Sequence, residues 1–221
     1  MKQLKIIVCI LFVQVGVYAQ ISLGGGFSSI KPFGGMQSCM GVHVFGELPK
    51  DDLSSLFLRV GMFEKIKDPI LGTTTVFAID PATTPAYQVI GYENSMNYTV
   101  IEGGNRYYVG DGYDSGFGAY GGGTAMVMFN TVKRDYDDYD QSLYKLNDSE
   151  AIPRGSIFNL GLGLGGGLKN TFAGVGTLYL DVQVNYLIRS QPSNSVAQSV
   201  GNSLYSPLLF SFNLGFRKDL Y

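Results

Sequence analysis

His43 carries the only imidazole in the chain, so it is the only candidate for a histidine general base. Beside a serine, such a base could activate a nucleophile for ester hydrolysis. The residues around His43 alternate between apolar and polar types, which is the pattern of a β-strand. His43 then lies in mid-strand on the face opposite the apolar residues. We therefore expect a structural histidine and predict that the protein is not an enzyme.

A glycine motif at residues 161–166 has the spacing G-x-G-x-x-G of dinucleotide-binding loops. That use requires a helix to begin at the motif, so that the N-terminus of the helix meets the pyrophosphate. Here a turn and another strand pattern follow the motif. We interpret these glycines as small residues on the inner face of a strand, and we predict no cofactor.

An acidic, tyrosine-rich segment could hold a divalent cation through its oxygen atoms. It comprises Asp135, Tyr136, Asp137, Asp138, Tyr139 and Asp140. The segment lacks the ordered spacing and the glycine of a calcium loop. We expect a solvated loop whose tyrosines and aspartates suit contacts with a partner protein, and we predict no metal site.

The first nineteen residues have the three parts of a secretory signal peptide. Lys2 and Lys5 form the charged start, residues 6–17 are almost wholly apolar, and Ala19 precedes the expected cleavage site. Residues 20–221 then form a single mature domain with one cysteine, Cys39, which excludes an internal disulfide. The slightly acidic net charge argues against a nucleic-acid partner that relies on a basic patch.

Long runs of strict alternation are the main structural signal after residue 20. In residues 177–189 and 208–217, every second side chain is apolar. The apolar faces of these two strands include Leu178, Leu180, Val182, Val184, Leu208, Phe210, Phe212 and Leu214. Strands in soluble sheets usually have about 5 to 6 residues. Thirteen residues tilted by about 45° cover on the order of 30 Å, the thickness of bilayer hydrocarbon. We therefore expect these apolar faces to contact lipid.

Eight such strands follow one another along the chain. They are predicted at residues 21–30, 38–48, 55–66, 96–109, 116–132, 157–168, 177–189 and 208–217. Short connections at residues 49–52, 111–116 and 169–174 alternate with long ones at 67–95, 133–155 and 190–206. This asymmetry is typical of transmembrane β-barrels, whose inner turns are short and whose outer loops are long. The predicted fold is an all-β, eight-stranded antiparallel transmembrane barrel. Residues 75–79 and 87–92 are also strand-like and predict a hairpin above the membrane.

Charged side chains fall mainly on the faces opposite the apolar ones. In a barrel of eight strands, the interior is just wide enough to be filled by side chains. We predict a charge network that fills the interior and consists of His43, Glu47, Arg59, Lys65, Glu102, Arg106, Asp181, Arg189 and Arg217. Charges placed there must be paired or hydrated.

The chain resembles the small outer-membrane β-barrel families common in Bacteroidota, which include PorT-like and OmpX/OmpA-like barrels. The resemblance rests on the Ala19–Gln20 junction, on Val-Ile-Glu-Gly-Gly-Asn-Arg-Tyr-Tyr at residues 100–108, on the glycines at 121–123, and on a final amphipathic strand that ends near Tyr221. It implies insertion into the outer membrane of a Gram-negative cell by the barrel-assembly machinery. It implies no substrate and no catalytic residue.

Three functions fit these observations. The first is a structural or interaction barrel, such as an accessory subunit of a secretion, assembly or surface machine, which binds other envelope proteins through its loops or its wall. The second is a narrow passive channel. The third is a soluble exported barrel that turns its apolar faces inward around a small apolar ligand.

Overall fold

The computed structural model describes residues 21–34, 37–68, 71–147, 154–198 and 206–220. The predicted signal peptide and Tyr221 lie outside these residues.

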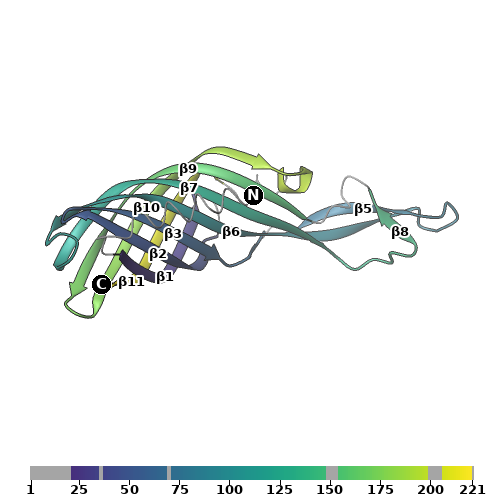
Figure 1. Ribbon diagram of the computed structural model, residues 1–221. Coiled ribbons are helices and arrows are strands. Elements are labelled where there is room, and N and C mark those ends of the chain that lie inside the picture. The colour runs from purple at the N-terminus through teal and green to yellow at the C-terminus, as the bar shows by residue number, and fades with distance from the viewer. Residues whose placement is uncertain (1–20, 35–36, 69–70, 148–153, 199–205, 221) are drawn as a thin grey trace, which may run out of the picture.

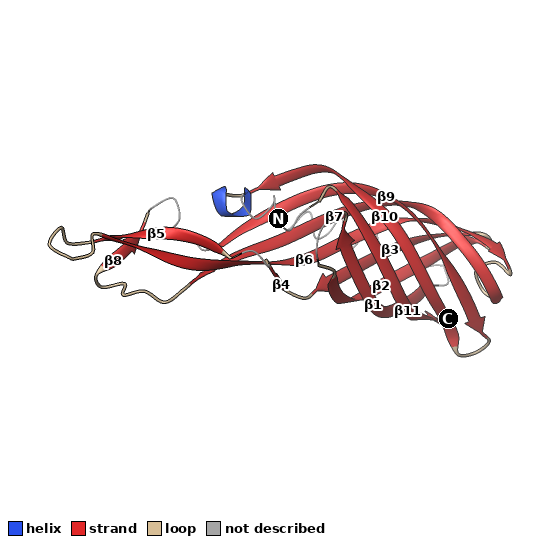
Figure 2. Cartoon of the chain, turned by 180° about the vertical axis from the view of Figure 1, so that it is seen from behind, coloured by secondary structure: helices blue, strands red, loops and turns tan. Residues whose placement is uncertain are grey.

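Eight strands form the wall of a closed antiparallel barrel (Figures 1 and 2). They are β1 (Ile21–Pro32), β2 (Cys39–Asp51), β3 (Ser54–Phe63), β6 (Tyr87–Gly110), β7 (Gly116–Tyr136), β9 (Arg154–Phe172), β10 (Gly176–Pro192) and β11 (Leu208–Leu220). Neighbouring strands pair in the order β3-β2-β1-β11-β10-β9-β7-β6, and the pairing of β3 with β6 closes the ring. The predicted fold class is confirmed. Closure leaves no wall strand with an open hydrogen-bonding edge along the paired region.

Three short strands lie outside the ring of eight. They are β4 (Ile66–Lys67), β5 (Gly72–Ala78) and β8 (Tyr144–Leu146). β5 pairs with the first residues of β6, so the hairpin predicted from residues 75–79 and 87–92 forms. β8 pairs with the other edge of β5.

The apolar faces of the wall strands point outward. Val182, Phe210, Phe212 and Leu214 are exposed, and Leu180 and Leu208 are half-buried on the same outer surface. Leu178 and Val184 share this orientation. The residues between them in sequence are buried inside the barrel, because successive side chains of a strand point to opposite faces.

The connections at the two ends of the barrel differ greatly in length. Residues 52–53, 111–115 and 173–175 make short turns at the end where Ile21 pairs with Leu220. The opposite end carries the long segments between β3 and β6, between β7 and β9, and between β10 and β11. Among the described residues, no helix is long and apolar enough to cross a membrane.

A narrow sheet extends from the long-loop end, and we call it the blade. It consists of β5, β8, residues 87–94 of β6 and residues 134–136 of β7. Figures 1 and 2 show it projecting well past the barrel. Val76, Ile90 and Tyr144 form a small buried core on one face of the blade, where Tyr136 and Tyr139 pack against it.

Candidate functional site

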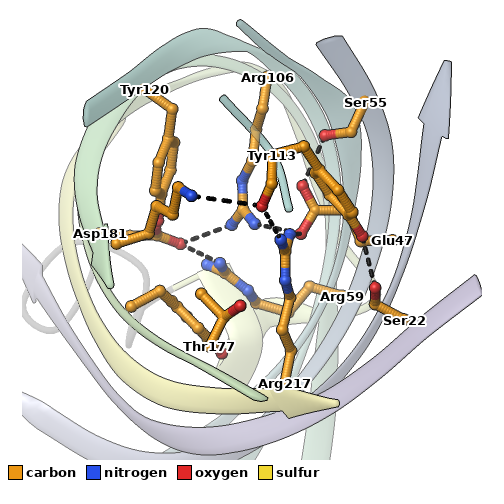
Figure 3. A network of polar contacts seen from close by, with 12 residues as sticks. Ser22, Glu47, Ser55, Arg59, Arg106, Tyr113, Tyr120, Thr177, Asp181 and Arg217 are labelled. Carbon is orange, nitrogen blue, oxygen red and sulfur yellow. Dashed lines mark hydrogen bonds and ion pairs between the residues drawn. The ribbon is translucent and has the colours of Figure 1, made fainter. Parts of the chain in front are cut away.

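A chain of alternating positive and negative side chains crosses the barrel interior (Figure 3). Arg59 donates to Glu102 at 2.7 Å and also to Asp181. Arg106 donates to Asp181 at 2.8 Å and to Glu47 at 3.0 Å. Arg217 donates to the same Glu47 oxygen at 2.7 Å. Three guanidinium groups therefore balance three carboxylates, which we call the interior network.

Strand geometry brings these six residues together from distant parts of the chain. They come from β2, β3, β6, β10 and β11, and each sits at an inward position of its strand. Arg59 and Glu102 are direct partners across the β3–β6 pair that closes the ring. Arg106 lies four residues after Glu102, so both face the same interior from one strand.

Aromatic and hydroxyl groups satisfy the remaining oxygen atoms of the network. Ser55 donates to Glu47 at 2.5 Å, and Tyr108 donates to the same carboxylate. Tyr120 donates to Asp181, and its ring lies 4.7 Å from the Arg106 guanidinium. Buried carboxylates are stable only with such partners, so the tyrosines belong to the network as much as the charges do.

The turn between β6 and β7 folds into the barrel mouth at the short-turn end. Tyr113 is fully buried there, and its hydroxyl lies 2.5 Å from Ser22 Oγ. Its backbone carbonyl accepts from Arg217 at 2.8 Å and from Lys169 at 3.3 Å. The Arg217 guanidinium stacks 3.7 Å from the Tyr113 ring. Figure 3 shows Tyr113 lying across the network. The turn therefore closes this end of the barrel.

His43 is engaged at both ring nitrogens. Nδ1 lies 2.7 Å from Ser28 Oγ, and Nε2 contacts the Tyr179 hydroxyl. Ser28 donates to Asn213 Oδ1 at 2.6 Å, so its oxygen is left to accept from His43 Nδ1. Only 3% of His43 is exposed. These are the surroundings of a structural histidine.

The half of the interior nearer the blade holds an apolar cluster with two buried asparagines in it, because Asn159 donates to Asn130 at 3.2 Å and Asn130 donates to the Met96 sulfur. Met96, Tyr98, Met126, Met128 and Leu187 are buried there in one cluster with residues of β1, β2, β9 and β11. Val196 and Ala197, from a helical turn at residues 195–198, complete it. Met126 and Met128 both point inward, on the face opposite Val127 and Phe129. A mainly apolar layer therefore covers the interior network.

The glycines of β9 leave room for the side chains that fill the interior. A Cβ atom at Gly161 would lie 2.9 Å from Leu187 Cδ2, and one at Gly167 would lie 2.6 Å from the Tyr120 ring. The G-x-G-x-x-G spacing is thus explained by packing inside a strand, and no helix follows it.

Two of the nine residues predicted for the interior lie outside it. Lys65 is exposed, because β3 ends at Phe63 and the break at residues 64–65 shifts the alternation before β4 resumes. Arg189 is also exposed, because a register shift between Leu187 and Arg189 turns it outward. A one-residue slip moves every later side chain to the other face. Both predictions were wrong for this reason. His43, Glu47, Arg59, Glu102, Arg106, Asp181 and Arg217 are buried inside.

The acidic segment lies along the base and the side of the blade. Asp135 pairs with Lys133 and, at 3.7 Å, with Lys65. The hydrogen bond from Lys133 lowers the pKa of Asp135. Asp140 accepts from the Ser142 hydroxyl at 2.5 Å, which lowers the pKa of Asp140. Asp137 and Asp138 are exposed, and no group of three metal-ligating side chains occurs among the described residues.

One face of the blade is uncovered. Phe77, Tyr87 and Val89 are 47%, 61% and 63% exposed on adjacent strands, and Phe77 pairs directly with Tyr87. The other face is covered by Tyr139, from the connection between β7 and β8, and by Tyr144 of β8. The blade thus presents an apolar surface that nothing in the described chain covers.

Four further residues contact the interior network or the turn that closes it but were not predicted from the sequence: Tyr108, Tyr113, Tyr120 and Lys169. Alternation could have placed Tyr108, which shares its face with Arg106. Tyr113 follows Gly112, which has a φ of 72° in the turn that enters the barrel. A turn has no alternation of apolar and polar residues, so the sequence pattern did not predict that Tyr113 points inward.

Comparisons with known proteins identify the fold. No known protein family matches the sequence, and no curated protein sequence matches it either. The structure is similar to that of Neisserial surface protein A, with a TM-score of 0.51 and 10% identity over 91% of this chain and 97% of that one. It also matches OprG from Pseudomonas aeruginosa, with a TM-score of 0.48, 14% identity and coverage of 91% and 97%. The match to a major outer membrane protein from Thermus thermophilus has a TM-score of 0.48 and 16% identity, over 92% of this chain and 100% of that one. The likeness to Neisserial surface protein A shows that the chain has the fold of a small outer-membrane β-barrel.

Proposed function

We propose that the protein is an integral outer-membrane barrel with a closed interior, which holds the blade above the cell surface to bind a partner protein. The observation that carries this proposal is the combination of a filled barrel with a long sheet whose exposed face is apolar. A filled barrel provides an anchor, and an uncovered apolar patch is typical of an interaction surface.

The outer wall supports insertion into a membrane. Along β7, the outward positions run from Phe117 to Phe129 without a charged side chain. Twelve residue steps cover roughly 40 Å along a strand, or about 28 Å at a tilt of about 45°. This height matches bilayer hydrocarbon. The third function considered, a soluble barrel around an apolar ligand, does not fit, because Asp181, Gln183 and Asn185 are buried inside.

The blade supports the interaction role. Residues 87–94 of β6 alone extend roughly 26 Å at 3.3 Å per residue, so Phe77 and Tyr87 stand well clear of the barrel rim. Short turns face the other side, as in barrels whose long segments lie outside the cell. Membership of a secretion, assembly or surface machine, and of the Bacteroidota barrel families in particular, stays a prediction from the sequence pattern.

Affinity purification from native outer membranes tests the proposal. Tagged wild-type protein, extracted in mild detergent, is expected to retain a stoichiometric partner. A variant with Phe77→Ser and Val89→Thr is expected to lose at least about tenfold in retained partner, because apolar anchors dominate such interfaces. Val175→Ser is the matched control, since Val175 is similarly exposed but lies in a turn at the opposite end.

Two results would contradict the proposal. Recovery of the protein in the soluble periplasmic fraction without detergent would rule out the membrane anchor. Retention of the partner by the Phe77/Val89 variant at the wild-type level would rule out the blade face as its binding site.

A further inference from the structure

Basic side chains form a row on the outer wall at the base of the blade. Lys67 of β4 pairs with Ser95 of β6, Ser95 pairs with Lys133 of β7, and Lys133 pairs with Arg154 of β9. Lys133 and Arg154 share the outward face of their strands with Phe129 and Phe158. Two cations therefore stand directly opposite each other across neighbouring strands, an arrangement that is destabilising unless an anion lies between or beside them.

Near this row, the part of the chain that the structure describes has fewer carboxylates than cations. Glu93 forms an ion pair with Lys67 at 2.6 Å, and Asp135 forms ion pairs with both Lys133 and Lys65. Among the described residues, four exposed cations thus face two carboxylates, and the Arg154 guanidinium has no carboxylate partner. The carboxylate of Glu64, which adjoins Lys65 in sequence, accepts a hydrogen bond from the backbone N–H of Met40 at 3.3 Å.

The height of the row places it at the lipid headgroups. Phe129 and Phe158 are direct partners, and their rings lie 5.3 Å apart at the top of the uncharged belt. Lys133 comes four residues after Phe129, which is roughly 13 Å along the strand and roughly 9 Å in height at a tilt of about 45°. The side chains point outward from the wall, toward lipid neighbours.

We propose that Lys133 and Arg154 bind a phosphate group carried by a glycolipid of the outer leaflet. This inference rests on the proposed outer-membrane location but does not depend on the partner of the blade. A guanidinium presents two parallel N–H groups to a phosphate, and the neighbouring ammonium adds a second charge-assisted hydrogen bond. A bound phosphate would supply the anionic partner that Arg154 lacks among the described residues and would add to the one that Asp135 gives Lys133.

The test measures lipid retention by native mass spectrometry of the full barrel in detergent. The probes are bisphosphorylated lipid A and the same lipid after removal of both phosphates. Wild-type protein is expected to prefer the phosphorylated form. The variant with Lys133→Gln and Arg154→Gln is expected to bind it on the order of thirtyfold more weakly, since each basic residue at a membrane surface contributes to the attraction of anionic lipid. Lys31→Gln with Arg189→Gln is the matched control, because both residues are exposed cations elsewhere on the wall.

Each outcome has a definite meaning. Loss in the Lys133/Arg154 variant alone supports the site, and inorganic phosphate in excess should not displace the lipid. Equal loss in the control variant, no preference for phosphorylated lipid A, or displacement by inorganic phosphate would overturn the inference. Heat-modifiable migration of every variant is recorded in parallel. A barrel that inserts normally but shows no phosphate preference removes this inference alone, whereas failure to insert contradicts the proposed function.

Discussion

Glu47 is the residue on which the interior network depends most. Its carboxylate is fully buried and accepts from Arg106, Arg217, Ser55 and Tyr108. Removing one partner of a buried ion pair leaves the other charge without compensation, which costs about 3 to 5 kcal/mol. A neutral side chain of the same shape at this position should therefore be poorly tolerated.

Glu47→Gln is expected to lower the free energy of unfolding by about 3 kcal/mol or more, because two guanidinium groups lose their shared carboxylate. Urea unfolding of the barrel in lipid vesicles, followed by tyrosine fluorescence, measures the change. Glu64→Gln makes the same chemical change on an exposed carboxylate and should alter stability by less than about 1 kcal/mol. Equal effects of the two substitutions would show that the network contributes little to stability.

At the scale of the strand, alternation separates a lipid-facing surface from an interior one. β11 shows this most clearly, because Phe210, Phe212, Leu214 and Phe216 point outward while Ser211, Asn213 and Arg217 are buried. The cost of a charge on the outward face depends on its depth in the bilayer. Two positions of one strand can therefore test the orientation of the whole wall.

Phe212→Arg is expected to destabilise the inserted barrel by about 2 to 4 kcal/mol, because it lies near mid-strand on the lipid face. Leu220→Arg, at the end of the same strand, should cost about 0 to 1 kcal/mol. Both side chains are 48% exposed, so exposure alone cannot explain a difference between them. Folding yield into vesicles and heat-modifiable migration measure the effect. Equal behaviour of the two variants would contradict a lipid-facing wall.

At the scale of the whole molecule, two different groups of side chains fill the barrel interior. A polar network lies in the half near the short turns, where Arg217 contacts the turn at Tyr113, and a mainly apolar cluster lies in the half below the blade. A cavity of about 10 Å³ lies beside Gln183 next to the network residues Arg106 and Asp181. Another of about 10 Å³ lies beside Asn213, where the network meets the apolar cluster, and each has room for about one water molecule. Gln183 Oε1 and Asn213 Nδ2 have no hydrogen-bond partner among the described residues, so one water in each cavity could satisfy them. Side chains fill the interior, which leaves little room for a continuous water path and so opposes ion passage.

The barrel is accordingly expected to show no stable ion conductance when it is inserted into planar lipid bilayers. An open porin of known conductance, inserted under the same conditions, controls for bilayer quality. Reproducible single-channel steps from the wild-type protein would instead favour the narrow passive channel that the sequence left open as an alternative.

The sequence predicted the wall well, because the facing of a strand residue follows from local backbone geometry. Leu178 and Asp181 could be assigned to opposite faces without any knowledge of their neighbours. The prediction failed at Lys65 and Arg189, where a strand break and a register shift interrupt the alternation. Such irregularities depend on how adjacent strands pair, which the residues of one strand do not reveal.

Which inward residues meet, and where the polar network ends, depends on how the strands are assembled into the barrel. Glu47 and Arg217 lie 170 residues apart, and only ring closure and the register between strands place them 2.7 Å apart. Met126 and Val127 are equally apolar, and the register of β7 against β9 sends Met126 inward. Alternation is local, so the residues of each strand were sufficient to predict a long-stranded barrel with a lipid-facing wall. Register and closure are properties of the assembled sheet, and they determined the network, its apolar cover and the projecting blade.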